Sequence, residues 1–360
     1  MKMLDRYIMK SVLFSMIVVT VIIISVDLVL SLADELPGSD GNYSMLNALW
    51  FVVQTTPTSI YELLPFSALG GALIGLGVLA SNNELVVMQA AGIQTWRIVW
   101  SVMKPTLGVM ILSLVLGEYI APGLEQVAQS NKALQQSGED TINSDQGNWR
   151  KIGNEFIHIN AIAPGGESLF GITRYEVDDS RQIVASSFAE SARYISATER
   201  TASYWRLGNV RKTRIEPGNL TAENYPQEDW QIDLSPELLS VLLVDPDRQS
   251  ISGLYRFAQF FVAEGLDARV YFLAFWKKLL QPLSTAALVL LAISFVFGPL
   301  REATIGFRVF VAIGIGLGFT IVQRVMEPAS LIYGLSPLFA VILPILLCLG
   351  MGAYFMQKVR

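Results

Sequence analysis

Residues 63–83 read LLPFSALGGALIGLGVLASNN and contain no aspartate, glutamate, lysine or arginine. An α-helix needs about 20 mostly apolar residues to cross the hydrocarbon core of a bilayer. The stretch therefore predicts a membrane-spanning helix. Its closely spaced glycines are typical of tight helix packing. They are not followed by the Lys-Ser/Thr pair of a phosphate-binding loop, so we expect no ATP site in this chain.

Five further windows are also mostly apolar, although 11–33 contains Asp27 and 98–122 contains Lys104 and Glu118. The composition of the whole chain agrees with them. The sequence is 52% apolar and 16% charged, whereas soluble domains contain about 45–50% apolar and about 25% charged residues. We therefore expect six membrane-spanning helices, three on each side of a polar insert. The other windows are 11–33, 98–122, 279–300, 309–323 and 328–357, the last with a helix starting near Ser336.

The polar insert differs sharply from this apolar frame. Residues 121–269 contain 14 Lys/Arg and 21 Asp/Glu, while the remaining 211 residues contain 12 and 10. Short alternating runs separated by turn residues such as Asn224-Tyr225-Pro226 predict β-strands and a jellyroll, sandwich or barrel. A helical pattern over 250–268 leads back to the membrane. The predicted strands are 149–161, 168–177, 182–195, 202–210 and 230–234.

The predicted fold is thus an α-helical membrane protein with six transmembrane helices, arranged 3+3 around an inserted, jellyroll-like all-β domain. Residues 1–122 would hold the first three helices, 123–265 the β domain and 266–360 the last three. The first apolar run is too long for a signal peptide and lacks a cleavage site, so we expect a retained anchor.

Basic residues in the short connections predict the orientation, because lysine and arginine are enriched on the cytoplasmic side. The connections 34–56 and 325–337 contain neither. We therefore expect both termini in the cytoplasm and the insert outside. The basic markers are Lys2, Arg6, Lys10, Arg97, Lys104, Arg301, Arg308, Lys358 and Arg360.

Charged residues within the spans form the first candidate site. On this topology they fall toward the external ends of the helices, where they could simply extend to the interface or line a functional cavity. Their shared level favours a functional rim, and Lys277 and Lys278 are the best candidates to hold an anionic headgroup. The candidates are Asp27, Glu62, Glu118, Lys277, Lys278, Arg324 and Glu327, with Lys132 just beyond the third span.

The second candidate site is the short segment between the second and third spans. Ser81-Asn82-Asn83-Glu84 is typical of a helix N-cap, and Gly92 is a suitable helix end. The predicted helix could lie in the interface as a connection. It could equally dock on a partner and offer Glu84 to a basic residue.

One cysteine, Cys348, and one histidine, His158, exclude disulfide scaffolds, Cys-His metal clusters and a Ser-His-Asp triad in the membrane. We expect His158 to be an ordinary strand residue and Cys348 to pack in the last span. The sequence predicts no catalytic residue, no metal site and no nucleic-acid binding.

Several motifs in order along the chain resemble the permease subunits of the bacterial lipopolysaccharide exporter, the LptF/LptG family. The resemblance begins near Leu4 and continues to the C-terminus. The motifs are LGVLA at 76–80, ELVVMQAAG at 84–92, GEYIAP at 117–122, DPDRQSISGL at 245–254, QPLS at 281–284 and SFVFGPLR at 294–301.

The resemblance implies an inner-membrane protein with a periplasmic β-jellyroll, in which LptF and LptG together enclose a cavity. The cavity would take lipopolysaccharide from the periplasmic leaflet and pass it to a jellyroll bridge that starts with LptC. The apolar side chains of spans one, two and five would receive the acyl chains. The chain would bind no cofactor, since ATP would be used by the partner ATPase LptB.

The resemblance also assigns roles to residues. A coupling helix would dock on LptB through Glu84, Leu85, Met88 and Gly92. Lys132 and Lys278 match basic positions at the periplasmic rim. Ser31 and Thr58 depart from the pattern, because some relatives carry lysine there.

Other functions remain as alternatives to this interpretation. An ion-coupled secondary transporter of an amphiphilic substrate would use Asp27, Glu62 and Glu118 as coupling groups. An intramembrane lipid enzyme is disfavoured, because the spans contain no histidine and no conspicuous Ser-Lys pair. A sensor would not need six spans and a docking helix.

Overall fold

The chain divides into two compact units, which we describe separately. The first contains residues 1–31, 55–123 and 246–360, and the second contains 32–54 and 124–245. The computed structural model describes residues 2–36, 44–136, 148–152, 154–162, 166–178, 182–196, 203–216, 219–232, 236, 245–263, 267–300 and 303–358.

Six helices in the described part of the chain are long and apolar enough to cross a membrane, which confirms the sequence prediction. The third span is α4 followed by a π-helical turn, Leu116–Ile120, and then α5. The helices are α1 (Lys2–Glu35), α2 (Met45–Ser81), α4 (Thr95–Val115), α5 (Ala121–Gln136), α8 (Arg269–Phe297), α9 (Ile305–Tyr333) and α10 (Pro337–Lys358). Two shorter helices are α3 (Glu84–Ala90) and α7 (Ile251–Ala263).

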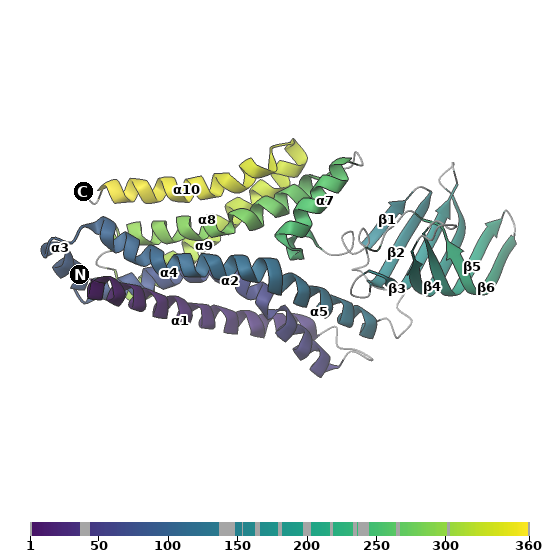
Figure 1. The fold of residues 1–360 in the computed structure, drawn as a ribbon, viewed down its shortest axis with the longest axis horizontal. Helices are drawn as coiled ribbons and strands as arrows, with labels where there is room; N and C mark the ends of the chain where they lie inside the picture. The colour runs from purple at the N-terminus through teal and green to yellow at the C-terminus, as the bar shows by residue number, and fades with distance from the viewer. Residues whose placement is uncertain are drawn as a thin grey trace. The chain divides into compact units, whose positions relative to one another are not determined.

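The helices extend beyond the uncharged windows because charged residues are tolerated at helix ends. The predicted window 309–323 is the centre of α9, which begins after Thr304 and ends at Gly334. The Thr304 side chain accepts a hydrogen bond from the Phe307 N–H, and Gly334 has φ +70°. The two chain ends and α3 lie at the same end of the helical bundle (Figure 1).

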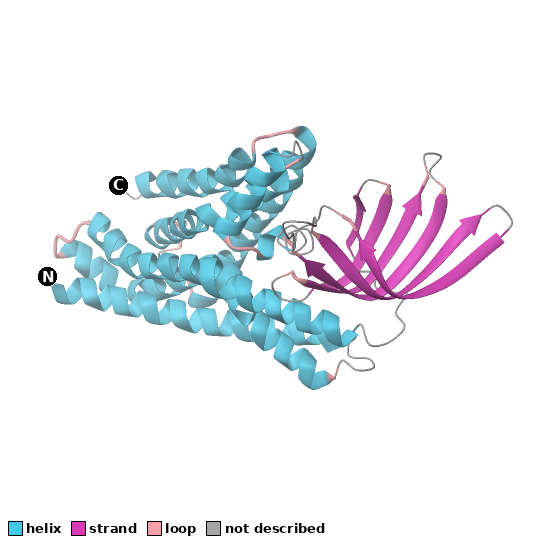
Figure 2. Ribbon diagram, turned by 45° about the vertical axis from the view of Figure 1, so that its right-hand side comes forward, coloured by secondary structure: helices cyan, strands magenta, loops and turns pink. Residues whose placement is uncertain are grey.

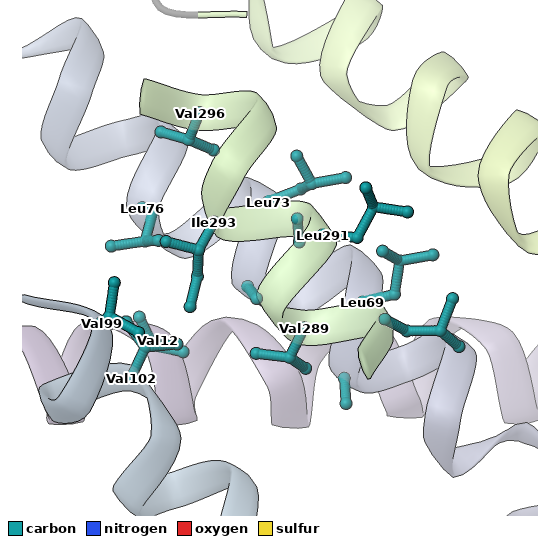
Figure 3. Close-up of a cluster of buried hydrophobic side chains, with 14 of the residues drawn as sticks. Val12, Leu69, Leu73, Leu76, Val99, Val102, Val289, Leu291, Ile293 and Val296 are labelled. Atoms are coloured by element: carbon teal, nitrogen blue, oxygen red, sulfur yellow. The ribbon is translucent and has the colours of Figure 1, made fainter. Parts of the chain in front are cut away.

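A core of buried apolar side chains joins four of these helices. Val12 of α1, Leu73 of α2, Val99 of α4 and Val289 of α8 are all fully or almost fully buried in one cluster (Figure 3). Apolar packing of this kind is one of the interactions that hold helices together in lipid.

The glycines of α2 permit a close approach to α1. A Cβ at Gly71 would lie 2.4 Å from the Cα of Met16, and one at Gly75 would lie 2.9 Å from the Cα of Val12. Any side chain at these positions would separate the helices. The packing interpretation of this glycine stretch is therefore confirmed.

The outer surface of the bundle is apolar, as expected where lipid replaces water. Phe14, Ile17 and Val21 of α1 are exposed, as are Phe310 and Ile321 of α9. These two helices are the least buried of the six spans. They therefore present the largest apolar faces to the surroundings of this chain.

The second unit contains a six-stranded antiparallel sheet in the order β1-β2-β3-β4-β5-β6. Each strand pairs with its neighbour in the sequence, and the sheet is strongly curved (Figure 2). Trp205, Leu207, Ile157 and Leu169 form the centre of its buried face. The prediction of an inserted all-β domain is confirmed. The strands are β1 (Asn148–Ile152), β2 (Glu155–Ile162), β3 (Ser168–Val177), β4 (Ile183–Ile195), β5 (Tyr204–Glu216) and β6 (Asn219–Trp230).

Two strand predictions were wrong in detail. The run 149–161 is a hairpin of β1 and β2 rather than one strand, and Trp230 ends a strand rather than starting one. The predicted turn at Asn224-Tyr225-Pro226 lies inside β6. Pro226 is tolerated because β6 is the last strand in the sheet order and has an edge without a described neighbour. Opposite it, Asn209 adopts φ 52°, and the ladder pairs Gly208 with Gln227 and Val210 with Tyr225.

Candidate functional site

The first unit contains an amphiphilic cavity of about 890 Å³ between α1, α2, α8 and α9. Its apolar wall consists of side chains from α1, α2 and α9, the first, second and fifth spans. Its polar end contains three acidic and three basic residues. The apolar wall includes Val19, Ile22, Ile23, Leu63, Pro65, Phe66, Ile74, Val309, Ile313, Leu317 and Phe319. The charged residues are Glu62, Asp247, Lys277, Lys278, Arg324 and Glu327.

Lys277 lies between two carboxylates at this polar end. Its Nζ is 3.3 Å from an Oδ of Asp247 and 3.0 Å from an Oε of Glu327. Its side chain remains 33% exposed. The ammonium is therefore both paired and accessible from the cavity.

The adjacent Lys278 has a different environment. Its Nζ donates a hydrogen bond of 2.6 Å to the backbone carbonyl of Gln249 and lies 5.4 Å from the centre of the Tyr61 ring. The side chain is buried. Lys278 thus fixes the backbone that follows Asp247, while Lys277 holds the Asp247 side chain.

Arg324 is the most accessible base of the polar end. It lies on the exposed side of α9, and it forms no ion pair with any residue that the structure describes. Glu62 lines the same space from α2. The structure therefore brings five of the sequence candidates together: Glu62, Lys277, Lys278, Arg324 and Glu327.

Two buried polar atoms next to these charges lack a hydrogen-bond partner within the described ranges. They are the hydroxyl of Tyr61 and Oε1 of Gln281. The amide nitrogen of Gln281 donates to the Tyr61 carbonyl at 2.7 Å. Since buried polar groups are normally paired, the polar end retains hydrogen-bonding capacity.

Sequence reasoning missed Asp247, Tyr61 and Gln281 as members of this site. Asp247 lies in a short 3₁₀ turn, Pro246–Arg248, before α7. The turn falls within the DPDRQ motif that carries the family resemblance, which was the available signal. Its contact with α8 could not be derived from spacing.

Three other candidates are placed elsewhere. Asp27 is not among the residues that line the cavity. Glu118 accepts hydrogen bonds from the N–H groups of Ile251 and Ser252, at 2.8 and 3.3 Å. It therefore caps α7, where the helix dipole favours a carboxylate. The ion-coupled transporter gains no support from these two acids.

Lys132 belongs to the second unit. Its Nζ is 2.7 Å from an Oε of Glu35, and it lies 4.7 Å from the centre of the Phe51 ring. The side chains of α1, α2 and α5 meet there. Its predicted role in lipid binding stays a prediction.

The predicted coupling helix is present as α3. Leu85 and Met88 are buried in the bundle core and anchor α3 there. Their predicted contact with a partner stays a prediction. The exposed residues between them are Val86 and Val87, which the sequence analysis did not single out. Gly92 has φ +84° and ends the helix, as predicted.

The predicted side-chain cap at the start of α3 was wrong. Asn83 adopts a left-handed conformation, φ 58°, and makes no capping hydrogen bond. Its neighbour Asn82 instead donates from its amide to an Oε of Glu84 at 3.4 Å.

A buried arginine lies beside α3. Nη1 of Arg308 donates to the carbonyl of Gly77, and Nε donates to that of Leu300 at 3.3 Å. Arg308 borders a space of about 730 Å³ that is also lined by Leu85 and Gln89. The sequence analysis treated Arg308 only as a topology marker. In the structure, Arg308 links α9 to the end of α2 through its hydrogen bond to the Gly77 carbonyl.

Six membrane-length helices, an amphiphilic cavity and an inserted antiparallel sheet define a multi-pass membrane protein suited to an amphiphilic ligand. The chain belongs to the lipopolysaccharide export system permease LptF/LptG family, whose model matches residues 6–358. It is therefore a subunit of an inner-membrane export permease and is not itself catalytic.

Similar proteins support the LptG branch of this family. The chain is 34% identical over 343 residues to the lipopolysaccharide export system permease protein LptG of Escherichia coli K12, covering 95% of this chain and 94% of the relative. It is 31% identical over 358 residues to the protein of the same name from Haemophilus influenzae, covering 99% of both.

Proposed function

We propose that the cavity between α1, α2, α8 and α9 receives lipopolysaccharide from the periplasmic leaflet of the inner membrane. The observation that supports this most directly is the division of the cavity into an apolar wall and a charged end. Acyl chains would contact α1, α2 and α9, and phosphates would meet Lys277 and Arg324. Lys278 would position the site, because its ammonium is already held by Gln249.

The energy for extraction would come from a separate ATPase, LptB. Exposing acyl chains costs about 0.8 kcal/mol per CH₂ group, so extraction requires an external energy source. LptB would dock at α3 through Glu84, Gly92 and the exposed Val86 and Val87. Movement of α3 would then reach the cavity through α2 and α9.

The sister subunit LptF would cover the exposed apolar faces of α1 and α9 and complete the cavity. Both termini and α3 would lie in the cytoplasm. Residues 123–265, with the antiparallel sheet, would form the periplasmic domain. The lipid would leave toward a jellyroll bridge that begins with LptC.

The coupling role is tested by purifying the complete complex with Glu84 intact and with Glu84→Ala. We expect the variant to lose ATP-driven lipopolysaccharide release while the complex remains monodisperse. The matched control is Glu190→Ala in β4, which removes a carboxylate far along the chain. Copurification of no ATPase, or full release by Glu84→Ala, would show that α3 is not the coupling element.

A further inference from the structure

Lys277 is paired with two carboxylates of the chain itself, although it is the best-placed lysine for a phosphate. Asp247 and Glu327 both contact its ammonium. The described charged residues that line the cavity are three acids and three bases, so their formal charges cancel. A phosphate that approaches Lys277 must therefore compete with these two carboxylates for its ammonium.

The two carboxylates differ in how easily they can leave. Asp247 is 57% exposed, lies 3.3 Å from Lys277 and comes from a three-residue turn. Glu327 is 27% exposed, lies 3.0 Å away and belongs to the long helix α9. The Asp247 pair is therefore the longer and more solvated of the two, and exposed pairs of this kind are weak.

We propose that the Asp247 carboxylate stands where a ligand phosphate would contact Lys277, and that it sets the specificity of Lys277 for phosphomonoesters. This inference rests on the proposed lipopolysaccharide site. An entering phosphate displaces the Asp247 carboxylate and takes over its contact with Lys277. Glu327 remains in place, and the hydrogen bond from Lys278 to Gln249 keeps the turn attached to α8.

The competition explains how the site distinguishes lipids. A phosphomonoester carries a charge of about −1.5 to −2 near neutral pH, more than the single charge of a carboxylate. The phosphodiester of a bulk phospholipid carries only one negative charge and gains no such advantage over Asp247. A ligand must therefore bind Lys277 more strongly than the Asp247 carboxylate does. The phosphomonoesters of lipid A meet this condition because of their higher charge.

The test uses the complete transporter complex in nanodiscs. Retention is measured for lipid A with two phosphates, for dephosphorylated lipid A and for phosphatidylglycerol as a competitor. The variants are Asp247→Asn, Lys277→Gln and the double variant. Glu62→Gln is the matched control, because it removes one carboxylate from the same cavity without removing an ion-pair partner of Lys277 at 4 Å or less.

We expect Asp247→Asn to retain lipid A about two- to fivefold more strongly and to be inhibited more strongly by phosphatidylglycerol. The gain should vanish in the Lys277→Gln background and with dephosphorylated lipid A. Glu62→Gln should increase lipid A retention by less than half of the gain seen with Asp247→Asn. If Asp247→Asn does not assemble, Asp247→Ser serves in its place, and Asp247→Glu should resemble the unmodified chain.

An unchanged or reduced retention by Asp247→Asn would overturn the inference. So would an equal gain in Glu62→Gln, which would indicate a general charge effect. Failure of the unmodified complex to retain any lipid A above empty nanodiscs would instead reject the proposed site itself. The two failures are therefore distinguishable.

Discussion

Two cations of the helical unit, Lys277 and Arg308, are held in opposite ways. Lys277 is one-third exposed and contacts two carboxylate side chains from different segments. Arg308 is 1% exposed and donates to backbone carbonyls of Gly77 and Leu300. They lie on different helices of one bundle. The partners of Lys277 are side chains that can rotate, whereas the partners of Arg308 are fixed backbone carbonyls.

The difference shows how a membrane protein can use charge for two purposes. Side-chain carboxylates change position by rotating a few bonds, so the Lys277 contacts can be exchanged for a ligand. The Gly77 carbonyl belongs to the backbone of α2, so this acceptor cannot rotate away as a carboxylate side chain can. Guanidinium is suited to such a fixed role because its donors point in a rigid fork.

The largest effect should follow removal of the fixed cation. Arg308→Ala leaves a cavity and removes the hydrogen bonds to the carbonyls of Gly77 and Leu300, and should cost about 2–4 kcal/mol of stability. The measurement is the Tm of the purified complex in detergent. Arg324→Ala removes the same side chain from the exposed side of the same helix, and should change stability by less than about 0.5 kcal/mol. Equal losses would contradict the contrast between the two sites.

A smaller effect is expected when the arginine is kept but displaced. A Cβ at Gly77 would lie 2.6 Å from Nη1 of Arg308, so Gly77→Ala should push the guanidinium off the carbonyl. Overpacking of this kind costs about 1–3 kcal/mol. We expect ATP hydrolysis to continue while lipopolysaccharide release falls, measured together in proteoliposomes. Gly314→Ala on α9 is the control, because a Cβ there meets no described atom within 4 Å.

The exchangeable cation should affect binding rather than stability. Lys277→Gln should weaken retention of lipid A about tenfold, the loss expected for one charged hydrogen bond. Lys278→Gln should instead lower the Tm, because it frees the Gln249 carbonyl.

Photo-crosslinkers at positions 132, 277 and 278 provide a second measurement of where the lipid headgroup binds. If none of them captures lipopolysaccharide while other positions do, the headgroup lies elsewhere.

The smallest effect concerns a buried base in the other unit. His158 of β2 is buried, and desolvation lowers its pKa below the ordinary value of 6.5 although a hydrogen bond to Asn160 opposes the shift. The unfolded chain therefore takes up a proton before the folded chain does, and stability should fall as pH drops below about 6.5. The chain has one histidine, so His158→Gln should flatten the dependence of Tm between pH 7.5 and 5.5. An unchanged slope would show that other groups dominate.

The spans were predictable because hydropathy is a local property of each window. The charged residues within them were also recognisable, since charge in a span is rare. Asp247 was missed because its partner Lys277 lies on another helix, and Arg308 because its role depends on the carbonyl of Gly77. Strand β6 was obscured by Asn224-Tyr225-Pro226, whose turn preference is overridden by pairing with β5. The inward direction of Leu85 and Met88 could be assigned only once the core was known.

The π-helical turn Leu116–Ile120 changes the direction in which the side chains of the third span point. Each residue of an α-helix advances the direction of its side chains by about 100°, and a π turn accommodates one extra residue. Here it directs Gly117 against the Tyr61 ring and Glu118 toward the start of α7. Deleting a single residue from this turn would rotate everything after it by about that angle, a change that no substitution can reproduce.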